Sequence, residues 1–346
     1  MSRVTIADVA SAAGVSKTAV SFAFNNPERL AQATLERVLG VAHDLGYAPH
    51  PAARALSTRR SGTIGVLIPQ PLSAVFANPF LSELIQGLGE LCEQHDLTLL
   101  LVPPLDGSLE SAIRNASVDG FISLGLAPDD HALEVLDGLG IPTVLVDSED
   151  SGAYPVVNVD DQAGAEAAAN HLLGLGHRRL AIIVLPPVRA QRTNTPTAAR
   201  RLAGYRAAIE AAGAPAPLTV TAGISVAAGI RAFESLPSGR QKPTGLLAMS
   251  DMAAIGVLSG AQARGIRVPL DLSVVGFDDL PVSAWTNPPL TTVRQPIVDK
   301  GRLAARMLID RMNGKEVGSP SPLKTRLVVR GSTAAPAGAD LQIRRR

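Results

Sequence analysis

Polar side chains recur on one side of a helix that the sequence predicts near its start. A helix from Lys17 to Asn25 would bury Val20 and Phe24 and turn five side chains outward: Lys17, Thr18, Ser21, Phe22 and Asn25. Lys17 could donate to guanine and Thr18 to a base or a phosphate, while the Phe22 ring could touch a thymine methyl. Ser21 and Asn25 would position the helix through hydrogen bonds to phosphates. The alternative is a face that is merely solvated, but a large apolar side chain on a polar face usually marks a contact surface.

A second group of polar residues stands where predicted strands end, much later in the chain. Its members are Asp147, Asp160, Ser250, Asp251 and Asp278. Ligands of parallel α/β sheets lie beyond the carboxyl ends of the strands, where carboxylates and hydroxyls can bond a small polar molecule. We therefore expect a binding site for such a molecule at these strand ends.

Signatures of catalysis are missing from the sequence. It contains no G-x-x-x-x-G-K-[ST], no G-x-G-x-x-G after a strand, no G-x-S-x-G and no H-E-x-x-H. The six histidines lack the spacing of metal ligands, and the single cysteine, Cys92, falls on the apolar side of a predicted helix. We expect no catalytic residue, no metal and no cofactor, and a buried, inert thiol at Cys92.

Two short helices are needed to position the outward face described first. Thr5 and Asp8 predict a capped helix start, apolar residues follow at helical spacing, and Gly14 ends this helix. Ser16 caps the next helix after a turn of three residues, which suits two helices that cross steeply. That is a helix-turn-helix, and periodic apolar residues over 35–45 predict a third helix.

Composition and charge indicate a globular protein with a small basic head. The 346 residues include 46% apolar and 18% charged side chains, which excludes disorder and allows two or three domains. Residues 1–60 hold seven Lys and Arg against four acids, a charge of +3, whereas the other 286 residues hold 25 bases and 27 acids. No apolar run reaches the roughly 18 residues of a membrane span, and no secretory signal is evident. We expect a cytoplasmic protein whose head binds a polyanion.

Apolar strands alternate with helices from residue 63 onward. The first half predicts strands at 63–69, 97–103, 120–126, 142–147 and 156–160, with a helix over 79–95. The second half predicts strands near 180–185, 218–222, 245–250 and 273–277, with helices that start near Asp161, Thr197, Ser225 and Asp251. This pattern predicts two βαβ-type halves, each a mostly parallel sheet covered by helices.

Several motifs in one order give the sequence a family resemblance over most of its length. The runs VTIADVASAAGVSKTAVSFAFN and LGYAPHPAARALSTRRSGTIGVLIP resemble the head, hinge and first effector strand of the LacI family of bacterial transcription regulators. The resemblance continues in PVVNVDDQAGAEAAANHLLGLGHRRLAII, RRLAGYRAAI and LSVVGFDDLPVSAWTNPPLTTVRQP. Two positions depart from the family: Phe22 replaces a common arginine, and Ala31 stands where many relatives have a serine cap worth about 1 kcal/mol.

The resemblance implies double-stranded DNA as a partner and assigns DNA-contacting residues. They are Thr5, Ser16, Lys17, Thr18, Ser21, Phe22, Asn25, Ala53 and Leu56. In the family the segment that matches residues 48–60 folds into a hinge helix only on DNA, where the leucine that matches Leu56 wedges into the minor groove. The alternative is a flexible linker between the head and the body.

The same resemblance implies a periplasmic-binding-protein-like body that holds an effector. Arg201 matches a position that clamps effector hydroxyls or carboxylates, although a structural ion pair of Arg201 with Asp278 is the alternative. Ile224 stands where relatives often present a stacking aromatic, so Phe80 and Trp285 are the remaining aromatic candidates, with core packing as the alternative. The expected effector-binding set is Phe80, Asp147, Asp160, Thr197, Arg201, Ile224, Ser250, Met252, Asp278 and Trp285.

The expected fold is an N-terminal all-α helix-turn-helix domain plus an α/β periplasmic-binding-protein-like effector domain of two parallel-sheet subdomains. We expect the helix-turn-helix domain at 1–47, the hinge at 48–60, the effector-binding and dimerisation domain at 61–333, and a flexible tail at 334–346. Within the effector domain, the first subdomain takes about 61–160 and 294–321, and the second takes about 161–293 and 322–333.

The expected function is that of a sequence-specific, DNA-binding transcriptional regulator, a repressor, that acts as a homodimer on a pseudopalindromic operator. A small polar effector such as a sugar would control its operator affinity. Two alternatives remain. A solute-binding protein would need a signal peptide and no helix-turn-helix, and a sugar-modifying enzyme on the same scaffold would need a nucleophile or an acid–base pair.

Overall fold

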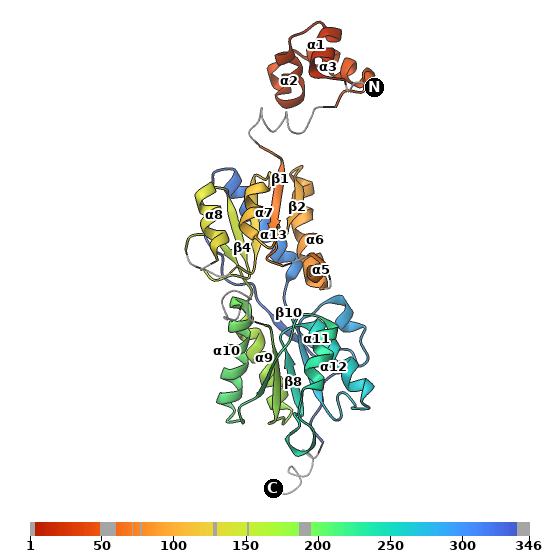
Figure 1. Ribbon diagram of the computed structural model, residues 1–346, viewed down its shortest axis with the longest axis vertical. Helices are drawn as coiled ribbons and strands as arrows, with labels where there is room; N and C mark the ends of the chain where they lie inside the picture. Colours follow the sequence, from red (N-terminus) through yellow and green to blue (C-terminus); the bar gives the residue numbers. More distant parts are fainter. Residues whose placement is uncertain are drawn as a thin grey trace. The chain divides into compact units, whose positions relative to one another are not determined.

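A small helical unit and a larger α/β unit make up the chain (Figure 1). The structure is a computed structural model that describes residues 4–48, 60–70, 72–76, 78–126, 130–150, 152–186 and 195–337. The small unit comprises Met1–Thr63 with Ser117–Asp119, and the larger unit comprises Ile64–Ala116 with Gly120–Arg346. Among the described residues, no helix has the length and apolar character that a bilayer crossing requires.

The described residues of the helical unit form three α-helices and a short 3-10 turn: α1 (Ile6–Ala13), α2 (Lys17–Asn25), η1 (Pro27–Arg29) and α3 (Gln32–Asp44). The Asp8 carboxylate accepts 2.8 Å hydrogen bonds from the backbone N–H and the hydroxyl of Thr5, which fix the start of α1 and lower the pKa of Asp8. Gly14 ends α1 at φ 65°, and the Ser16 hydroxyl accepts from the Ala19 N–H at 3.1 Å to begin α2. The expected helix-turn-helix is confirmed.

The helices of this unit enclose one small apolar core. One valine from each helix, Val9, Val20 and Val38, is completely buried. Val20 therefore packs inward as expected, whereas Phe24 is only partly buried and meets the Tyr47 ring edge-on, with ring centroids 5.7 Å apart. The buried side of α2 leaves its opposite side free to carry polar residues.

The third helix starts about one turn before the apolar periodicity that predicted it. It begins at Gln32, whose side-chain amide donates to the Glu36 carboxylate at 2.8 Å along the same side of the helix. The cap residue, Ala31, makes no side-chain hydrogen bond, as the missing hydroxyl predicts.

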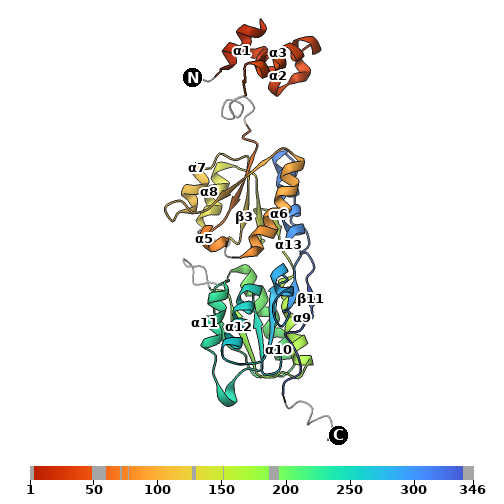
Figure 2. The same cartoon turned by 90° about the vertical axis from the view of Figure 1, so that its right-hand side faces the viewer.

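The larger unit contains two sheets, and the first of them has the strand order β2-β1-β3-β4-β5. Its elements are β1 (Thr63–Leu67), α5 (Leu72–Val75), α6 (Pro79–Gln94), β2 (Thr98–Val102), α7 (Leu109–Asn115), β3 (Gly120–Leu124), α8 (His131–Leu139), β4 (Thr143–Val146), β5 (Val156–Val157) and α13 (Ile297–Met312). β1, β3, β4 and β5 pair in parallel, with Ile64 opposite Gly120 and Phe121 opposite Thr143. Figure 2 shows α7 and α8 on one face of this sheet and α6 and α13 on the other.

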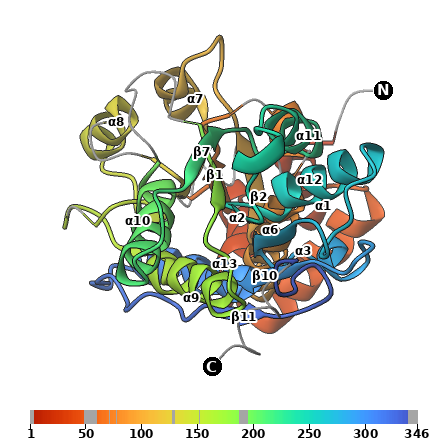
Figure 3. The same ribbon diagram turned by 90° about the horizontal axis from the view of Figure 1, so that it is seen from below.

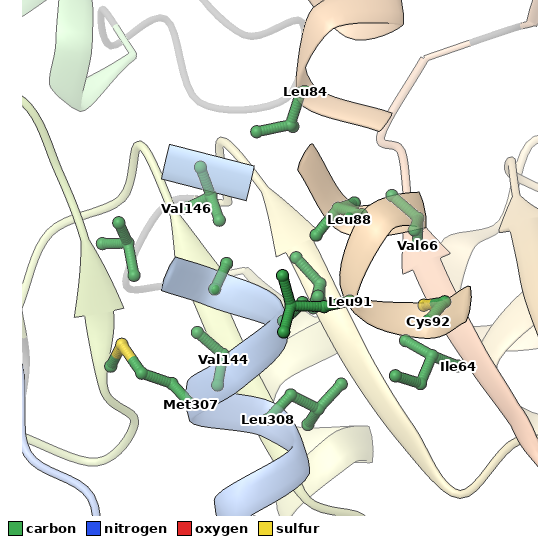
Figure 4. Close-up of a cluster of buried hydrophobic side chains, with 14 of the residues drawn as sticks. Ile64, Val66, Leu84, Leu88, Leu91, Cys92, Val144, Val146, Met307 and Leu308 are labelled. Atoms are coloured by element: carbon green, nitrogen blue, oxygen red, sulfur yellow. The ribbon is translucent and has the colours of Figure 1, made fainter. Parts of the chain in front are cut away.

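Side chains of α6 and α13 fill the core against the first sheet (Figure 4). Leu84 and Leu88 of α6 are fully buried there. The two helices approach so closely that a Cβ added at Gly87 would lie 2.0 Å from the Val298 carbonyl oxygen, and one added at Gly301 would lie 2.4 Å from that of Leu84. Because α13 comes after most strands of the second sheet in the chain, the first subdomain is completed only when the chain returns to it.

The second sheet has the strand order β11-β10-β9-β8-β6-β7. Its elements are α9 (Asp161–Gly174), β6 (Leu180–Val184), α10 (Pro196–Ala211), β7 (Leu218–Thr221), α11 (Val226–Glu234), η2 (Gly239–Gln241), β8 (Gly245–Ala248), α12 (Asp251–Ala263), β9 (Ser273–Asp278), η3 (Pro281–Ala284), β10 (Thr291–Arg294) and β11 (Arg326–Val328). Figure 3 shows the α9 and α10 pair and the α11 and α12 pair on opposite faces. The expected architecture of two helix-covered, mostly parallel sheets is confirmed.

Two details of the sheets differ from the expectation. The strand expected at 156–160 is only Val156–Val157, because Asp160 instead caps α9 by accepting from the Ala163 N–H at 3.0 Å. The antiparallel strand β11, with Leu327 opposite Val293, was not expected. Residues 158–160, 295–296 and 313–325 connect elements of one sheet with elements of the other.

Candidate functional site

The outward face of α2 carries the polar side chains that the sequence assigned to it. Lys17 and Thr18 are exposed, while Ser21 and Asn25 are half-buried and are joined by a 3.3 Å hydrogen bond from the Asn25 amide to the Ser21 hydroxyl. The Ser16 hydroxyl is engaged as the cap of α2. Lys17 and Thr18 therefore present the most accessible polar groups of this face.

The expectation that Phe22 stands exposed on this face is wrong in part. Its side chain is half-buried, and the guanidinium carbon of Arg29 lies 5.4 Å from the ring centroid. The short turn η1 brings Arg29 back over α2, which gives the ring a partner within its own unit. This contact supports the alternative that Phe22 packs on its own unit, and the thymine contact stays a prediction.

The expected hinge contacts, Ala53 and Leu56, lie outside the described residues. Just beyond them, the Asp119 carboxylate accepts from the backbone N–H groups of Ser61 and Gly62, at 2.6 and 2.8 Å. The chain that leads into β1 is therefore held at a defined point.

A buried cluster of charged side chains gathers at the carboxyl ends of strands in the larger unit. Arg201 on α10 is a buried cation of this cluster: Nε donates to Asp161 Oδ1 at 2.8 Å, and Nη1 donates to the Met249 carbonyl at 2.5 Å. Nη1 also lies 3.7 Å from Asp278 Oδ1, and the guanidinium carbon lies 3.7 Å from the centroid of the Phe277 ring. The pairing of Arg201 with Asp278, which was the alternative to effector binding, exists, but the shorter contact is with Asp161, which the sequence marked only as a helix start.

Lys300 on α13 belongs to the same cluster, although the sequence analysis did not select it. Its side chain is completely buried, and Nζ donates to both carboxylate oxygens of Asp147 at 2.8 and 3.0 Å and to Gln295 Oε1 at 2.8 Å. The Gln295 amide nitrogen donates in turn to Asp278 Oδ1 at 2.6 Å. A chain of direct contacts thus joins Asp147, at the end of β4, with Asp278, at the end of β9.

Arg200 makes a second connection between the cluster and the first subdomain. It donates to Asp161 Oδ2 at 2.9 Å, to Asn158 Oδ1 at 3.2 Å and to the Ser148 carbonyl at 3.4 Å. A 3.4 Å contact to the Thr197 hydroxyl brings in a further expected residue. Gln295 and Arg200 therefore each bridge the two subdomains by hydrogen bonds.

Burial changes the protonation of the carboxyl groups in this cluster. Burial raises the pKa of Asp278 to about 8, against the opposing effect of Arg201, and the nearby carboxylate of Asp251 raises it further. Burial also raises the pKa of Asp251, although Ser283 and Thr292 donate hydrogen bonds to it at 2.6 and 2.5 Å. A carboxyl group that keeps its proton near neutral pH can donate as well as accept a hydrogen bond.

The remaining expected effector residues are not all brought together. Phe80 lies at the cluster, with Lys300 Nζ 5.2 Å from its ring centroid, and Met252 packs against the core of the first subdomain. Other expected residues have different surroundings: Asp160 and Ser250 cap α9 and α12, Ile224 is half-buried, and Trp285 is 79% exposed. Trp285 is thus neither a core residue nor part of the cluster.

A cavity of about 480 Å³ opens beside this region. Its lining includes Glu83, Asp279, Arg294, Gln295 and Arg302, and none of the sequence-predicted effector residues. Gln295 is the residue that it shares with the cluster.

Among the described residues, no group of three His, Cys, Asp or Glu side chains is placed to hold a metal ion. Cys92 is buried, and burial raises the pKa of its thiol to about 11.

A helix-turn-helix head followed by a two-sheet α/β body defines the class of ligand-responsive, DNA-binding transcriptional regulators. Residues 5–50 match the bacterial regulatory proteins of the lacI family, and residues 169–333 match the periplasmic binding protein-like domain. The chain belongs to the LacI family, and the resemblance found in the sequence is confirmed.

Relatives of known function align with nearly the whole chain. The transcriptional repressor CytR of Escherichia coli (strain K12) is 34% identical over 342 residues, which cover 96% of this chain and 96% of the relative. The regulator CelR of Thermobifida fusca is 33% identical over 343 residues, which cover 95% and 98%. The relatives are transcriptional regulators rather than enzymes.

Solved structures agree with this assignment. The Lac repressor dimer bound to operator and the anti-inducer ONPF superposes with a TM-score of 0.83 at 26% identity, over 96% of this chain and 100% of that one. A complex of the regulator CelR with cellobiose superposes with a TM-score of 0.72 at 30% identity, over 95% and 100%.

Proposed function

We propose that this regulator is a repressor that binds a pseudopalindromic operator as a homodimer. A small, sugar-like effector binds between the two subdomains and thereby either weakens or strengthens operator binding. One observation carries the effector site: Asp147 and Asp278, polar residues from the strand ends of two different sheets, are joined through Lys300 and Gln295. A ligand that exchanges hydrogen bonds with this cluster acts on both subdomains at once.

On DNA, α2 enters the major groove, and Lys17 and Thr18 reach base edges or phosphates. The proposed contact set keeps Thr5, Ser16, Ser21, Phe22, Asn25, Ala53 and Leu56. Two heads related by twofold symmetry need half-sites about one helical turn apart. The protein acts where DNA is, in the cytoplasm.

At the effector, Arg200, Arg201, Thr197 and the carboxyl groups of Asp147 and Asp278 supply donors and acceptors for hydroxyl groups, with Phe80 as an apolar wall. The relatives are transcriptional regulators, which supports the proposal that the cluster binds its effector without turnover. The domain boundaries expected from the sequence, with the hinge at 48–60 and the tail at 334–346, are part of the proposal.

The test is a selection of random duplex DNA by the full-length protein, followed by titration of the selected site with and without neutral sugars. The proposal expects a twofold-symmetric site whose affinity changes when a sugar is present. A site without symmetry, or a symmetric site that no sugar affects, contradicts the corresponding half of the proposal.

A further inference from the structure

Lys300 has no exposed surface, which is a costly place for an ammonium group. An isolated charge in a protein interior loses several kcal/mol of hydration unless partners replace the water. Here Asp147 and Gln295 supply three acceptor contacts of 2.8 to 3.0 Å, which match the three donors of an ammonium. The lysine is therefore built into the cluster and does not merely lie near it.

Close packing holds the fully buried Lys300 in place. The next residue, Gly301, lies against the backbone of α6, where an added Cβ would come within 2.4 Å of the Leu84 carbonyl oxygen. The Phe80 ring closes another side, with its centroid 5.2 Å from Nζ. The backbone of α13 thus fixes the position of this charge beside the Asp147 carboxylate.

The charges of Lys300 and Asp147 compensate each other inside the described cluster. Two contacts, of 2.8 and 3.0 Å, join the ammonium to the carboxylate, and the third donor of the ammonium goes to the uncharged Gln295 amide oxygen. Without Lys300 the Asp147 carboxylate would lose its buried cation, and without Asp147 the buried ammonium would lose its anion.

We propose that the Lys300–Asp147 pair determines the charge class of the effector, so that the site accepts an uncharged polyhydroxylated molecule and rejects its acidic, phosphorylated and amino derivatives. The inference rests on the proposed function of the cluster as an effector site. An ionic ligand would add an uncompensated charge beside a buried pair whose two charges already compensate each other, which is costly. A neutral polyol can instead bond the two members that reach the surface, Asp147 and Arg200, whose side chains are 13% and 27% exposed.

The experiment measures full-length protein by calorimetry against matched probes: glucose, glucosamine and glucuronate; ribose and ribose 5-phosphate; cellobiose and cellobionate. Lys300→Met removes the cation at similar side-chain length, Asp147→Asn removes the anion at the same shape, and the double variant removes both. Lys315→Met, at an exposed lysine beyond the end of α13, is the matched control.

The wild type and the Lys315→Met control should bind the neutral sugar of each series at least about tenfold more tightly than its charged derivatives. A difference of about 1.4 kcal/mol from one charge contact corresponds to a factor of ten in affinity. Asp147→Asn should shift the preference about tenfold toward glucuronate or ribose 5-phosphate, and Lys300→Met toward glucosamine. The double variant should again prefer the neutral sugar. If Lys300→Met does not fold, the double variant can still be measured, because it contains no unpaired buried charge at this pair.

Each other outcome has a defined meaning. A wild type that prefers a charged member, or single variants whose preference ratios equal that of the wild type, overturns the inference and leaves the effector site intact. If no probe binds the wild type, the proposed control by a sugar-like effector fails, and this inference fails with it.

Discussion

Arg201 Nε donates to Asp161 Oδ1 at 2.8 Å in a part of the molecule where neither side chain is more than 5% exposed. The pair joins the N-terminal turn of α9 to α10, and Asp161 is shared with Arg200. Two adjacent arginines therefore hold one carboxylate from both sides, and their remaining donors face Asp278, Asn158 and Ser148. This arrangement makes α9 and α10 one unit at the cluster.

Removal of the Arg201 guanidinium should be strongly destabilising. Arg201→Ala removes the buried arginine partner of Asp278 and leaves Asp161 with its contact to Arg200, a loss that is expected to cost about 3 to 5 kcal/mol in the free energy of unfolding. Urea unfolding of the full-length protein measures it. Arg267→Ala, which breaks an exposed pair with Asp271, is the control and should cost no more than about 1 kcal/mol. An equal loss in both variants contradicts the account.

A separate variant addresses the effector role of Arg201. Arg201→Lys keeps the buried charge but loses the forked donor geometry, so it should retain operator binding while its response to a sugar weakens at least about tenfold. Operator titrations with and without the sugar measure this response. A full response in Arg201→Lys would mean that the guanidinium only supports the fold.

The stability of the protein should depend on pH through Asp278. Its carboxyl group binds a proton in the folded state up to about pH 8, whereas the unfolded chain releases that proton near its ordinary value of about 4. The folded state binds more protons in this window, so the free energy of unfolding falls as pH rises from about 4 to about 8. The charged and polar groups that act on it are Arg201, Asp251, Gln295, Lys300 and Tyr205.

The comparison variant is Asp278→Asn, which has no proton to lose. Its unfolding free energy, measured by urea at several pH values, should decline less steeply, by up to about 1.4 kcal/mol per pH unit. Identical slopes in the parent and the variant would show that Asp278 is ionised throughout this range.

The exposed lysine of α2 should read sequence. Lys17→Ala is expected to cost about 1 to 3 kcal/mol of operator binding and to relax the choice of base at one position of each half-site. Selection from random DNA and anisotropy titration measure both effects. Lys324→Ala, at an exposed lysine of the larger unit, should change neither. A uniform loss on all sequences would place Lys17 on a phosphate instead.

Leu56 should be needed for DNA bending if it wedges between base pairs. Leu56→Ala is expected to lose most of the bend and much of the operator affinity, while its sugar affinity remains that of the parent. Gel mobility on circularly permuted fragments reports the bend. A variant that bends DNA as well as the parent would identify residues 48–60 as a linker.

Periodicity in the sequence predicted the helix-turn-helix and both sheets because their elements have regular apolar faces. The cluster was predicted only in part. Asp147, Arg201 and Asp278 were found, since strand ends and a family motif mark them. Lys300 carries no such mark: in sequence it is one lysine on an amphipathic helix, and its burial arises only when α13 packs against α6. Phe22 was judged more exposed than it is, because the return of Arg29 over its ring is a tertiary contact.

A sugar that binds at the buried cluster is proposed to change the affinity of the protein for its operator. The most direct test of this coupling is a thermodynamic cycle on the full-length protein, in which operator affinity is measured with and without a saturating sugar, and sugar affinity with and without operator. The account predicts that the two ratios are equal and lie between about 5-fold and 150-fold, the usual range of coupling between sites. A sugar that binds at the cluster with both ratios equal to one would contradict it.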